Sequence, residues 1–347
     1  MRFDYPVTQT IDVSNQDELR EALLAHDRVR LAGSGSAQLR IPVPEQDVTL
    51  ISLTGMNRIL RLEADDLTCT VEPGVRREDL DRALDEIGVY LPCSGSGTIG
   101  GIFASDEAGS MGPGQPEPRS LLLGFSGCLS DGTTFRSGSR VVKNVAGFDL
   151  SKLFVGSRGR LFAVTTMHLK LKRQPQSTLD FYCPSLELNA ALGLLSRLRG
   201  MATGPALLCL EMTVDGFAVG GTLQGHRAVL ERSSEELGLA PGSAPTRERR
   251  NEGREVLRGQ VPFRRLGTLI EAIPRDAAFT MTGQRFALES TPAVVDEVLT
   301  GLPQLGGWGE IVEGAGRRRG RRTPEDPASD RLCARLKDAL DPRGALL

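Results

Sequence analysis

The sequence is poor in the residues and segments that build metal sites, disulfide scaffolds or membrane spans. Its six cysteines are scattered without a CxxC pair, which argues against an iron–sulfur carrier and favours a reduced, cytosolic protein. No run approaches the ~18 apolar residues of a transmembrane helix, and no apolar segment of signal-peptide length opens the chain. We therefore expect a soluble, cytoplasmic protein without a metal, in which any membrane contact is made through a partner.

The net charge is close to zero, and the chain has few histidines. The formal charge is −2 in 347 residues, which gives no argument for binding nucleic acid or a membrane surface. The three histidines are His26, His168 and His226, far apart in the sequence. Each is expected to be structural or solvated, with His168 near the exposed end of a strand. The sequence therefore offers no catalytic base.

Glycine is abundant instead, and it gathers in loops. The chain has 40 glycines, about 12% against the usual ~7%. Two loops combine glycine with serine: the first loop, Gly33–Ser36, and the second loop, Ser94–Thr98. Successive backbone N–H groups in such loops can bind an anion without a lysine. For either loop alone, an ordinary surface turn is an equally good interpretation.

The stretch Gly95–Gly100 has the GxGxxG spacing of a Rossmann dinucleotide site. Its context does not fit, because the chain after Gly101 is soon interrupted by Gly109 and Gly112, which predicts a poor helix. The position near residue 120, where the ribose-binding carboxylate would be expected, falls in Pro118-Arg119-Ser120-Leu121-Leu122. We therefore reject an NAD site.

Hydrophobic periodicity predicts an α+β chain rather than a doubly wound sheet. Helices are expected over Ser14–Ala25, capped by Ser14, and over Arg77–Ile87, Asp149–Phe154 and Ala328–Leu340. Strands are expected over Arg28–Ala32, Val48–Leu53, Ile59–Leu62, Leu67–Val71 and Leu161–Leu171, with a hairpin over Leu121–Ser137. Signals after Pro175 are weaker, and Pro241–Gly253 is expected to be a loop.

A third segment gives the two loops a context. Residues 138–172 contain Val142-Lys143-Asn144-Val145-Ala146-Gly147-Phe148-Asp149-Leu150, then Gly156-Ser157-x-Gly159-x-Leu161 and a strand into Leu169-Lys170-Leu171-Lys172. With Val71-Glu72-Pro73-Gly74 and the closing segment Leu336–Leu346, this order resembles the FAD-binding domain of the p-cresol methylhydroxylase/vanillyl-alcohol oxidase type. Within that superfamily it is most similar to the FAD-binding subunit of bacterial glycolate oxidase. The resemblance covers about residues 28–175 and returns at the C-terminus.

The resemblance implies FAD as the cofactor. Because no histidine stands near either loop for a covalent link, we expect the FAD to be dissociable. The resemblance also assigns residues to the FAD. These are Gly33, Ser34, Gly35 and Ser36 in the first pyrophosphate loop, Ser94, Gly95, Gly97, Thr98 and Gly101 in the second, the Gly159–Val164 backbone beside the adenine, and Asn144 and Asp149 near the flavin. Local backbone bonding is an equally good interpretation of Asn144 and Asp149. Cys93 is expected to be a buried thiol rather than a covalent flavin link. Arg158 and Arg160 are bulky and stand on either side of Gly159, so the site can accommodate them only if their side chains point to solvent.

The implied architecture is a two-part FAD-binding domain with a smaller α+β cap domain. We expect the FAD-binding domain over 1–175, the cap domain over 176–315, a disordered arginine-rich linker over 316–327 and a C-terminal helix over 328–347 that returns to the first domain. The run Arg317–Arg322 is interpreted as solvated linker, with docking to an acidic partner as the alternative.

The implied function is an FAD-binding subunit of a glycolate oxidase-like complex that acts on a small 2-hydroxy acid. Its implied partners are a paralogous catalytic flavoprotein subunit and an iron–sulfur subunit. Two alternatives stay open. The chain could be a stand-alone FAD-dependent dehydrogenase of a hydroxy acid or alcohol, or a scaffold subunit that has lost FAD.

Overall fold

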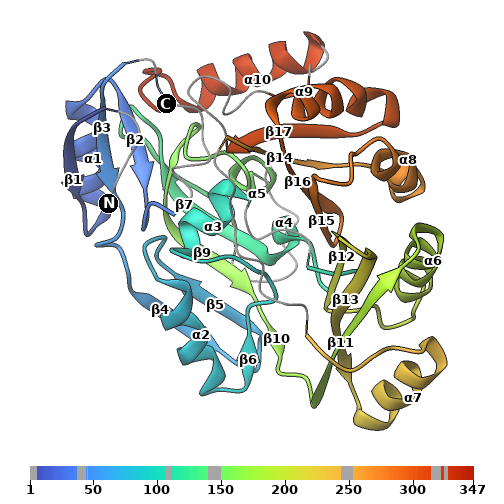
Figure 1. Cartoon of the computed structure of the whole chain (residues 1–347). Helices are drawn as coiled ribbons and strands as arrows, with labels where there is room; N and C mark the ends of the chain where they lie inside the picture. The colour runs from blue at the N-terminus through green and yellow to red at the C-terminus, as the bar shows by residue number, and fades with distance from the viewer. Residues whose placement is uncertain are drawn as a thin grey trace. The chain divides into compact units, whose positions relative to one another are not determined.

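The computed structural model describes residues 6–36, 44, 46–106, 111–139, 150–243, 253–313, 322–323 and 327–347. The chain forms two compact units, each built from separate stretches of sequence (Figure 1). The first unit comprises Met1–Ala108, Glu117–Gln174 and Glu325–Leu347, and the second comprises Gly109–Pro116 and Pro175–Pro324. Both units mix helices and strands, which confirms the α+β prediction.

The first unit contains two main sheets and a short ribbon. A parallel three-stranded sheet has the order β1-β3-β2, formed by Val7–Asp12, Val48–Ser52 and Val29–Ala32. An antiparallel five-stranded sheet has the order β4-β5-β9-β7-β8, formed by Ile59–Glu63, Thr68–Val71, Ala163–Lys170, Leu122–Cys128 and Thr134–Gly138. The ribbon pairs β6 (Val89–Tyr90) with β10 (Lys172–Arg173). The predicted strands and hairpins of this unit are therefore confirmed, with small shifts at their ends.

Helices cover these sheets and complete the core of the first unit. They are α1 (Gln16–Ala25), α2 (Arg77–Asp85), α3 (Ile99–Ser105), α4 (Pro118–Leu121), α5 (Ser151–Phe154) and α10 (Pro327–Leu340). The larger core contains four phenylalanine rings in mutual contact, Phe125, Phe135, Phe154 and Phe162. A smaller core lies between α1 and the parallel sheet.

Two local predictions about helices are wrong. The cap of α1 is Asn15, whose side chain accepts hydrogen bonds from the N–H groups of Asp17 and Glu18, because Ser14 is engaged with the Glu18 carboxylate at 2.8 Å. A helix, α3, does form, beginning at Ile99 inside the GxGxxG stretch, because its seven residues end before Gly109 is reached. The preceding strand β6 is antiparallel to its partner, so this is still no βαβ unit.

The C-terminal segment extends the parallel sheet. The Val29 N–H donates to the Ala345 carbonyl at 2.8 Å, and the Leu347 N–H donates to the Val29 carbonyl at 3.0 Å, so the tail lies parallel to β2. The buried Asp341 carboxylate accepts from the N–H groups of Ala345 and Leu346 at 3.1 and 3.0 Å and pairs with Lys337. This carboxylate fixes the turn that brings the tail to the edge of β2.

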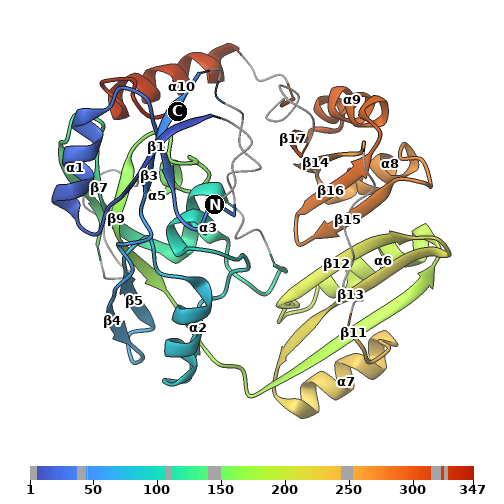
Figure 2. The same cartoon turned by 60° about the vertical axis from the view of Figure 1, so that its left-hand side comes forward.

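The second unit is one antiparallel sheet with helices packed against it (Figure 2). The order is β11-β13-β12-β15-β16-β14-β17, formed by Ser177–Leu186, Gly216–Gly225, Leu207–Thr213, Ala278–Thr282, Arg285–Ser290, Glu255–Gln260 and Trp308–Glu313. The helices are α6 (Leu188–Arg199), α7 (Arg227–Leu237), α8 (Leu266–Glu271) and α9 (Pro292–Gly301). One apolar core joins the helices to the strands.

A short segment from the first half of the sequence belongs to this second unit. The Gly114 N–H donates to the Pro205 carbonyl at 2.9 Å, and the Leu208 N–H donates to the Met111 carbonyl at 3.1 Å. A Cβ on Gly114 would lie 2.0 Å from the Gly204 carbonyl oxygen, so only glycine allows this approach. The described residues of this segment, 111–116, which the sequence analysis assigned to the first domain, therefore pack with the second unit.

None of the helices in the described ranges combines the length and apolar composition that a bilayer-spanning segment needs.

Candidate cofactor site

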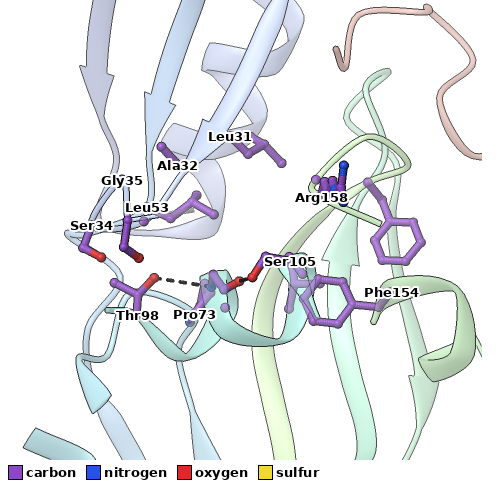
Figure 3. Close-up of a pocket in the computed structure, with 18 residues that line it drawn as sticks. Leu31, Ala32, Ser34, Gly35, Leu53, Pro73, Thr98, Ser105, Phe154 and Arg158 are labelled. Carbon is purple, nitrogen blue, oxygen red and sulfur yellow. Dashed lines mark hydrogen bonds between the residues drawn. The ribbon is translucent and has the colours of Figure 1, made fainter. Parts of the chain in front are cut away.

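A pocket opens in the first unit, and glycine and serine form much of its wall (Figure 3). The wall is formed by the end of β2 and the first loop, by α3, and by the segment from Phe154 to Val164. Leu53 and Pro73, which the sequence analysis did not assign to a site, complete it.

All four residues of the first loop line the pocket: Gly33, Ser34, Gly35 and Ser36. Gly35 has a φ of +83°, a conformation that favours glycine. Within the described ranges, the backbone N–H groups of Gly33, Ser34 and Gly35 donate no hydrogen bond to another residue. These three N–H groups are therefore not used by the described part of the chain, and neighbouring N–H groups of this kind can bind an anion.

The second loop reaches the pocket only through its last residue, Thr98. Gly97 stands behind the first loop instead, where a Cβ would lie 2.5 Å from Ser34 Oγ and 2.6 Å from Ser36 Oγ. Gly95 faces the core side chain of Ile102. Of the predicted site residues in and after this loop, Thr98 and Gly101 line the pocket, whereas Ser94, Gly95 and Gly97 do not.

The two loops touch each other directly. A Cβ on Gly33 would lie 1.9 Å from Thr98 Oγ1, which leaves no room for any side chain at Gly33. The Ser36 hydroxyl lies 3.5 Å from the Ser96 carbonyl oxygen. The loops are therefore neighbours at one end of one pocket.

Arg77, at the start of α2, supports the second loop from the side away from the pocket. Its backbone N–H donates to the Gly97 carbonyl at 2.8 Å, and its guanidinium donates to the carbonyls of Cys93 at 2.7 Å and Leu91 at 3.2 Å. The same guanidinium pairs with Asp81 at 2.7 Å. The sequence analysis missed this role, although the i,i+4 spacing of Arg77 and Asp81 was a visible signal.

Cys93 is a buried thiol beside this arginine. Its Sγ lies 3.3 Å from Arg77 Nη1, and burial raises its pKa to about 11 despite that positive charge. Burial also raises the pKa of Cys69 to about 12. Both thiols are protonated near neutral pH, and neither lines the pocket.

The remaining wall is fixed to the C-terminal end of α3. The Gly156 N–H donates to the Phe103 carbonyl at 3.1 Å, and the Arg158 N–H donates to the Ala104 carbonyl at 2.7 Å. Gly159, with a φ of +72°, packs against Leu31 of β2. Gly159 and Val164, both predicted site residues, therefore line the pocket together with the buried rings of Phe154 and Phe162.

The expectation that Arg158 points to solvent is wrong. Arg158 is half-buried and forms part of the pocket wall, whereas Arg160 is exposed. The Arg158 N–H bonds to the Ala104 carbonyl, far earlier in the sequence, and its φ is +57°, so its place on the pocket wall depends on a long-range contact.

Several other candidates lie elsewhere. Asn144 and Asp149 are outside the described residues. His168 is half-buried rather than exposed, with Nδ1 at 3.0 Å from Thr70 Oγ1, because its strand β9 lies between β5 and β7. His26 lies near Gln9, and His226 directly precedes α7. None of the three histidines lines the pocket.

The sequence was compared with known families and curated proteins. Residues 10–138 match the profile of a family described as "FAD binding domain". The chain is 31% identical over 202 residues to glycolate oxidase subunit GlcD of Bacillus subtilis, covering 56% of this chain and 43% of that protein. It is 31% identical over 170 residues to glycolate oxidase subunit GlcE of Escherichia coli, covering 47% of this chain and 48% of that protein. It is 29% identical over 168 residues to the mitochondrial D-lactate dehydrogenase [cytochrome] of Arabidopsis thaliana, covering 47% of this chain and 30% of that protein.

The chain thus matches less than half the length of each of these curated relatives. Among solved structures it is similar to alkyldihydroxyacetonephosphate synthase in two crystal forms, with TM-scores of 0.68 and 0.67 and 15% identity. Those matches cover 97% of this chain and 75% and 76% of the others, and at such low identity they establish the fold alone. The chain carries an FAD-binding domain of the p-cresol methylhydroxylase type, its cofactor is FAD, and its relatives are FAD-dependent oxidoreductases of the glycolate oxidase and D-lactate dehydrogenase type.

Proposed function

We propose that this protein is an FAD-binding subunit of a complex that oxidises a small 2-hydroxy acid such as glycolate. The observation that supports this most is the single pocket in which the open N–H groups of the first loop meet Thr98 of the second. A pyrophosphate needs several convergent donors, and this wall offers them without a lysine.

The chemistry of the pocket fits a dinucleotide. We propose that the N–H groups of Gly33, Ser34 and Gly35, with the Thr98 hydroxyl, bind the pyrophosphate, and that Ser36 completes the first loop. The other end of the pocket is apolar and aromatic, which suits the adenosine half. Gly159 and Val164 would lie beside that half, and Asn144 and Asp149 near the flavin.

We propose that FAD is held without a covalent bond. Cys93 is buried behind the second loop, with a raised pKa and no place on the pocket wall. When bound, FAD supplies the two-electron acceptor for oxidation of a hydroxy acid. The chain's own contribution is to bind and orient the cofactor.

A catalytic base for the substrate hydroxyl is not identified in this chain. The second unit has a single histidine, His226, directly before α7. This agrees better with a subunit that relays or supports electron transfer than with a complete dehydrogenase. The proposed partners are a paralogous catalytic flavoprotein subunit and an iron–sulfur subunit. The proposed location is the cytoplasm, with any membrane contact made by those partners.

Purified protein tests the proposal in two steps. After incubation with FAD and removal of free cofactor, the protein should show the flavin absorption bands. Anaerobic addition of glycolate or D-lactate should leave these bands unchanged in the isolated chain and bleach them in the complex isolated from native cells.

The contrary outcomes identify the alternatives. Bleaching of the isolated chain by either acid would establish a stand-alone dehydrogenase, the function that the D-lactate dehydrogenase relatives favour. Failure to retain FAD would indicate a scaffold subunit. Isolation from native cells without a flavoprotein or iron–sulfur partner would contradict the subunit role.

A further inference from the structure

Arg158 is the one charged side chain among the described residues that line the pocket. The remaining wall consists of glycine, small polar residues and apolar side chains. In such surroundings water screens a cation less than it does at an open surface, so hydrogen bonds from it are stronger. This makes the arginine a strong candidate for recognising a ligand.

The backbone at Arg158 is a second reason to assign it a role. Its φ of +57° is a conformation that glycine and asparagine adopt more readily than arginine does. Gly156 and Gly159, on either side, also have positive φ values of +87° and +72°. A cation therefore stands where glycine would be less strained, and strain of this kind concentrates at functional sites.

The position of Arg158 in the pocket indicates which part of a dinucleotide it meets. Figure 3 shows Arg158 and Phe154 on the side of the pocket away from Ser34, Gly35 and Thr98. The first loop occupies the end proposed for the pyrophosphate. Arg158 therefore belongs to the aromatic end.

We propose that the Arg158 guanidinium recognises the adenosine half of FAD. This inference rests on the proposed placement of FAD in the pocket. The adenine ring nitrogens and ribose oxygens are acceptors for its planar set of donors, and the guanidinium plane also stacks on a ring. Arg158 thereby holds the half of the cofactor that takes no part in redox chemistry.

The test compares Arg158→Asn with Arg160→Asn, a control that removes the same charge two residues away on an exposed side chain. Dissociation constants are measured by calorimetry for FAD and for ADP, which carries the adenosine half without a flavin. Arg158→Asn should weaken both ligands by the same factor, about 10- to 100-fold, the value of a hydrogen bond from a charged group. Arg160→Asn should leave both within twofold of the wild type.

Stability and charge give independent readouts. Asparagine tolerates a positive φ, so Arg158→Asn should raise the melting temperature of the cofactor-free protein by about 2–4 °C while affinity falls. If Arg158 had only a structural role, its replacement by asparagine would not raise the melting temperature while lowering the affinity for FAD and ADP. Arg158→Lys, which keeps the charge, should bind FAD more tightly than Arg158→Asn does.

The proposal is overturned if Arg158→Asn binds both ligands like the wild type, or if FAD is weakened and ADP is not. The variant Gly97→Ala distinguishes a wrong role for Arg158 from a wrong placement of FAD in the pocket. If Gly97→Ala loses FAD and Arg158→Asn does not, the pocket stays the proposed FAD site and the role of Arg158 is refuted. Retention of FAD by both variants would refute the placement of FAD and the inference with it.

Discussion

The two glycine loops have similar composition and different structural roles. The first loop lies on the pocket wall over its whole length and presents open N–H groups. The second loop touches the pocket only at Thr98, and its Gly97 packs against the back of the first loop. The first loop is thus placed to contact a ligand, and the second to hold the first in position.

This difference shows what glycine does in each loop. In the first loop, the lack of side chains leaves room for a ligand. In the second, it leaves room for the first loop itself, because Gly97 fits against the hydroxyls of Ser34 and Ser36. Substitutions in the second loop should therefore act on the cofactor indirectly.

The largest effect is expected from Gly33→Ala. The added Cβ would lie 1.9 Å from Thr98 Oγ1, so the loops must move apart. FAD binding should be lost, and the free energy of unfolding should fall by about 3 kcal/mol, the upper end for overpacking. Urea unfolding measures the change in the free energy of unfolding, and flavin retention measures the loss of FAD binding. Adding Thr98→Ala removes the clashing oxygen and should restore part of the stability; no recovery would contradict the contact.

Two alanine substitutions within the second loop sharpen the comparison. Gly97 and Gly95 have φ values of +93° and +120°, so both substitutions are strained. Gly97→Ala also pushes on the first loop and should weaken FAD binding about 100-fold, or ~2.7 kcal/mol. Gly95→Ala should destabilise the protein and leave the FAD dissociation constant of the folded form unchanged. Equal effects on FAD would mean that the second loop acts as a single ligand-binding element.

Arg77→Lys tests whether the second loop needs support from behind. Lysine keeps a charge near Asp81 and loses the paired contacts to the Leu91 and Cys93 carbonyls. We expect a loss of about 2 kcal/mol in unfolding free energy and a smaller loss of FAD affinity. Arg76→Lys is the matched control: its pair with Glu78 is exposed, and its effect should stay below about 0.5 kcal/mol.

A pH-dependent effect concerns the lead-in to the second loop. The folded pKa of Cys93 is about 11, above its ordinary value of 9.0. Above pH ~9 the unfolded chain loses this proton first, so the contribution of this one thiol to stability should fall by about 1.4 kcal/mol per pH unit until the folded pKa is reached. Below pH ~8 the thiol should contribute no pH dependence.

Urea unfolding between pH 8 and about 10.5 measures that slope. Cys93→Ala should remove one thiol's share of it, whereas Cys333→Ala, which changes an exposed thiol, should not. Identical slopes in the two variants would show that the Cys93 proton does not distinguish folded from unfolded chain.

Most of the first unit was predictable because its signals are local. The Asp131-Gly132 turn and alternating residues predict the β7–β8 hairpin, which forms over Leu122–Cys128 and Thr134–Gly138. The second unit gave weaker signals. Strand β13 carries Gly220 and Gly221 in its interior, and glycines blur the alternation on which such predictions depend.

The site was predictable in location and less so in detail. Glycine and serine content identifies both loops, and the order of motifs identifies the cofactor. The separate roles of Gly35 and Gly97 depend on what packs behind each residue, which composition does not encode. The inward position of Arg158 depends on a hydrogen bond to Ala104, far away in the sequence. Long-range contacts of this kind set the detail of the site.

The contact between β2 and the C-terminal tail has a consequence for biosynthesis. Leu346 packs into the core beside α1 and adds its backbone to the edge of a sheet whose other strands were translated some 300 residues earlier. The ribosome makes the whole second unit between these two parts. The edge of the parallel sheet at Val29 therefore stays unpaired until the segment around Leu346 has been translated.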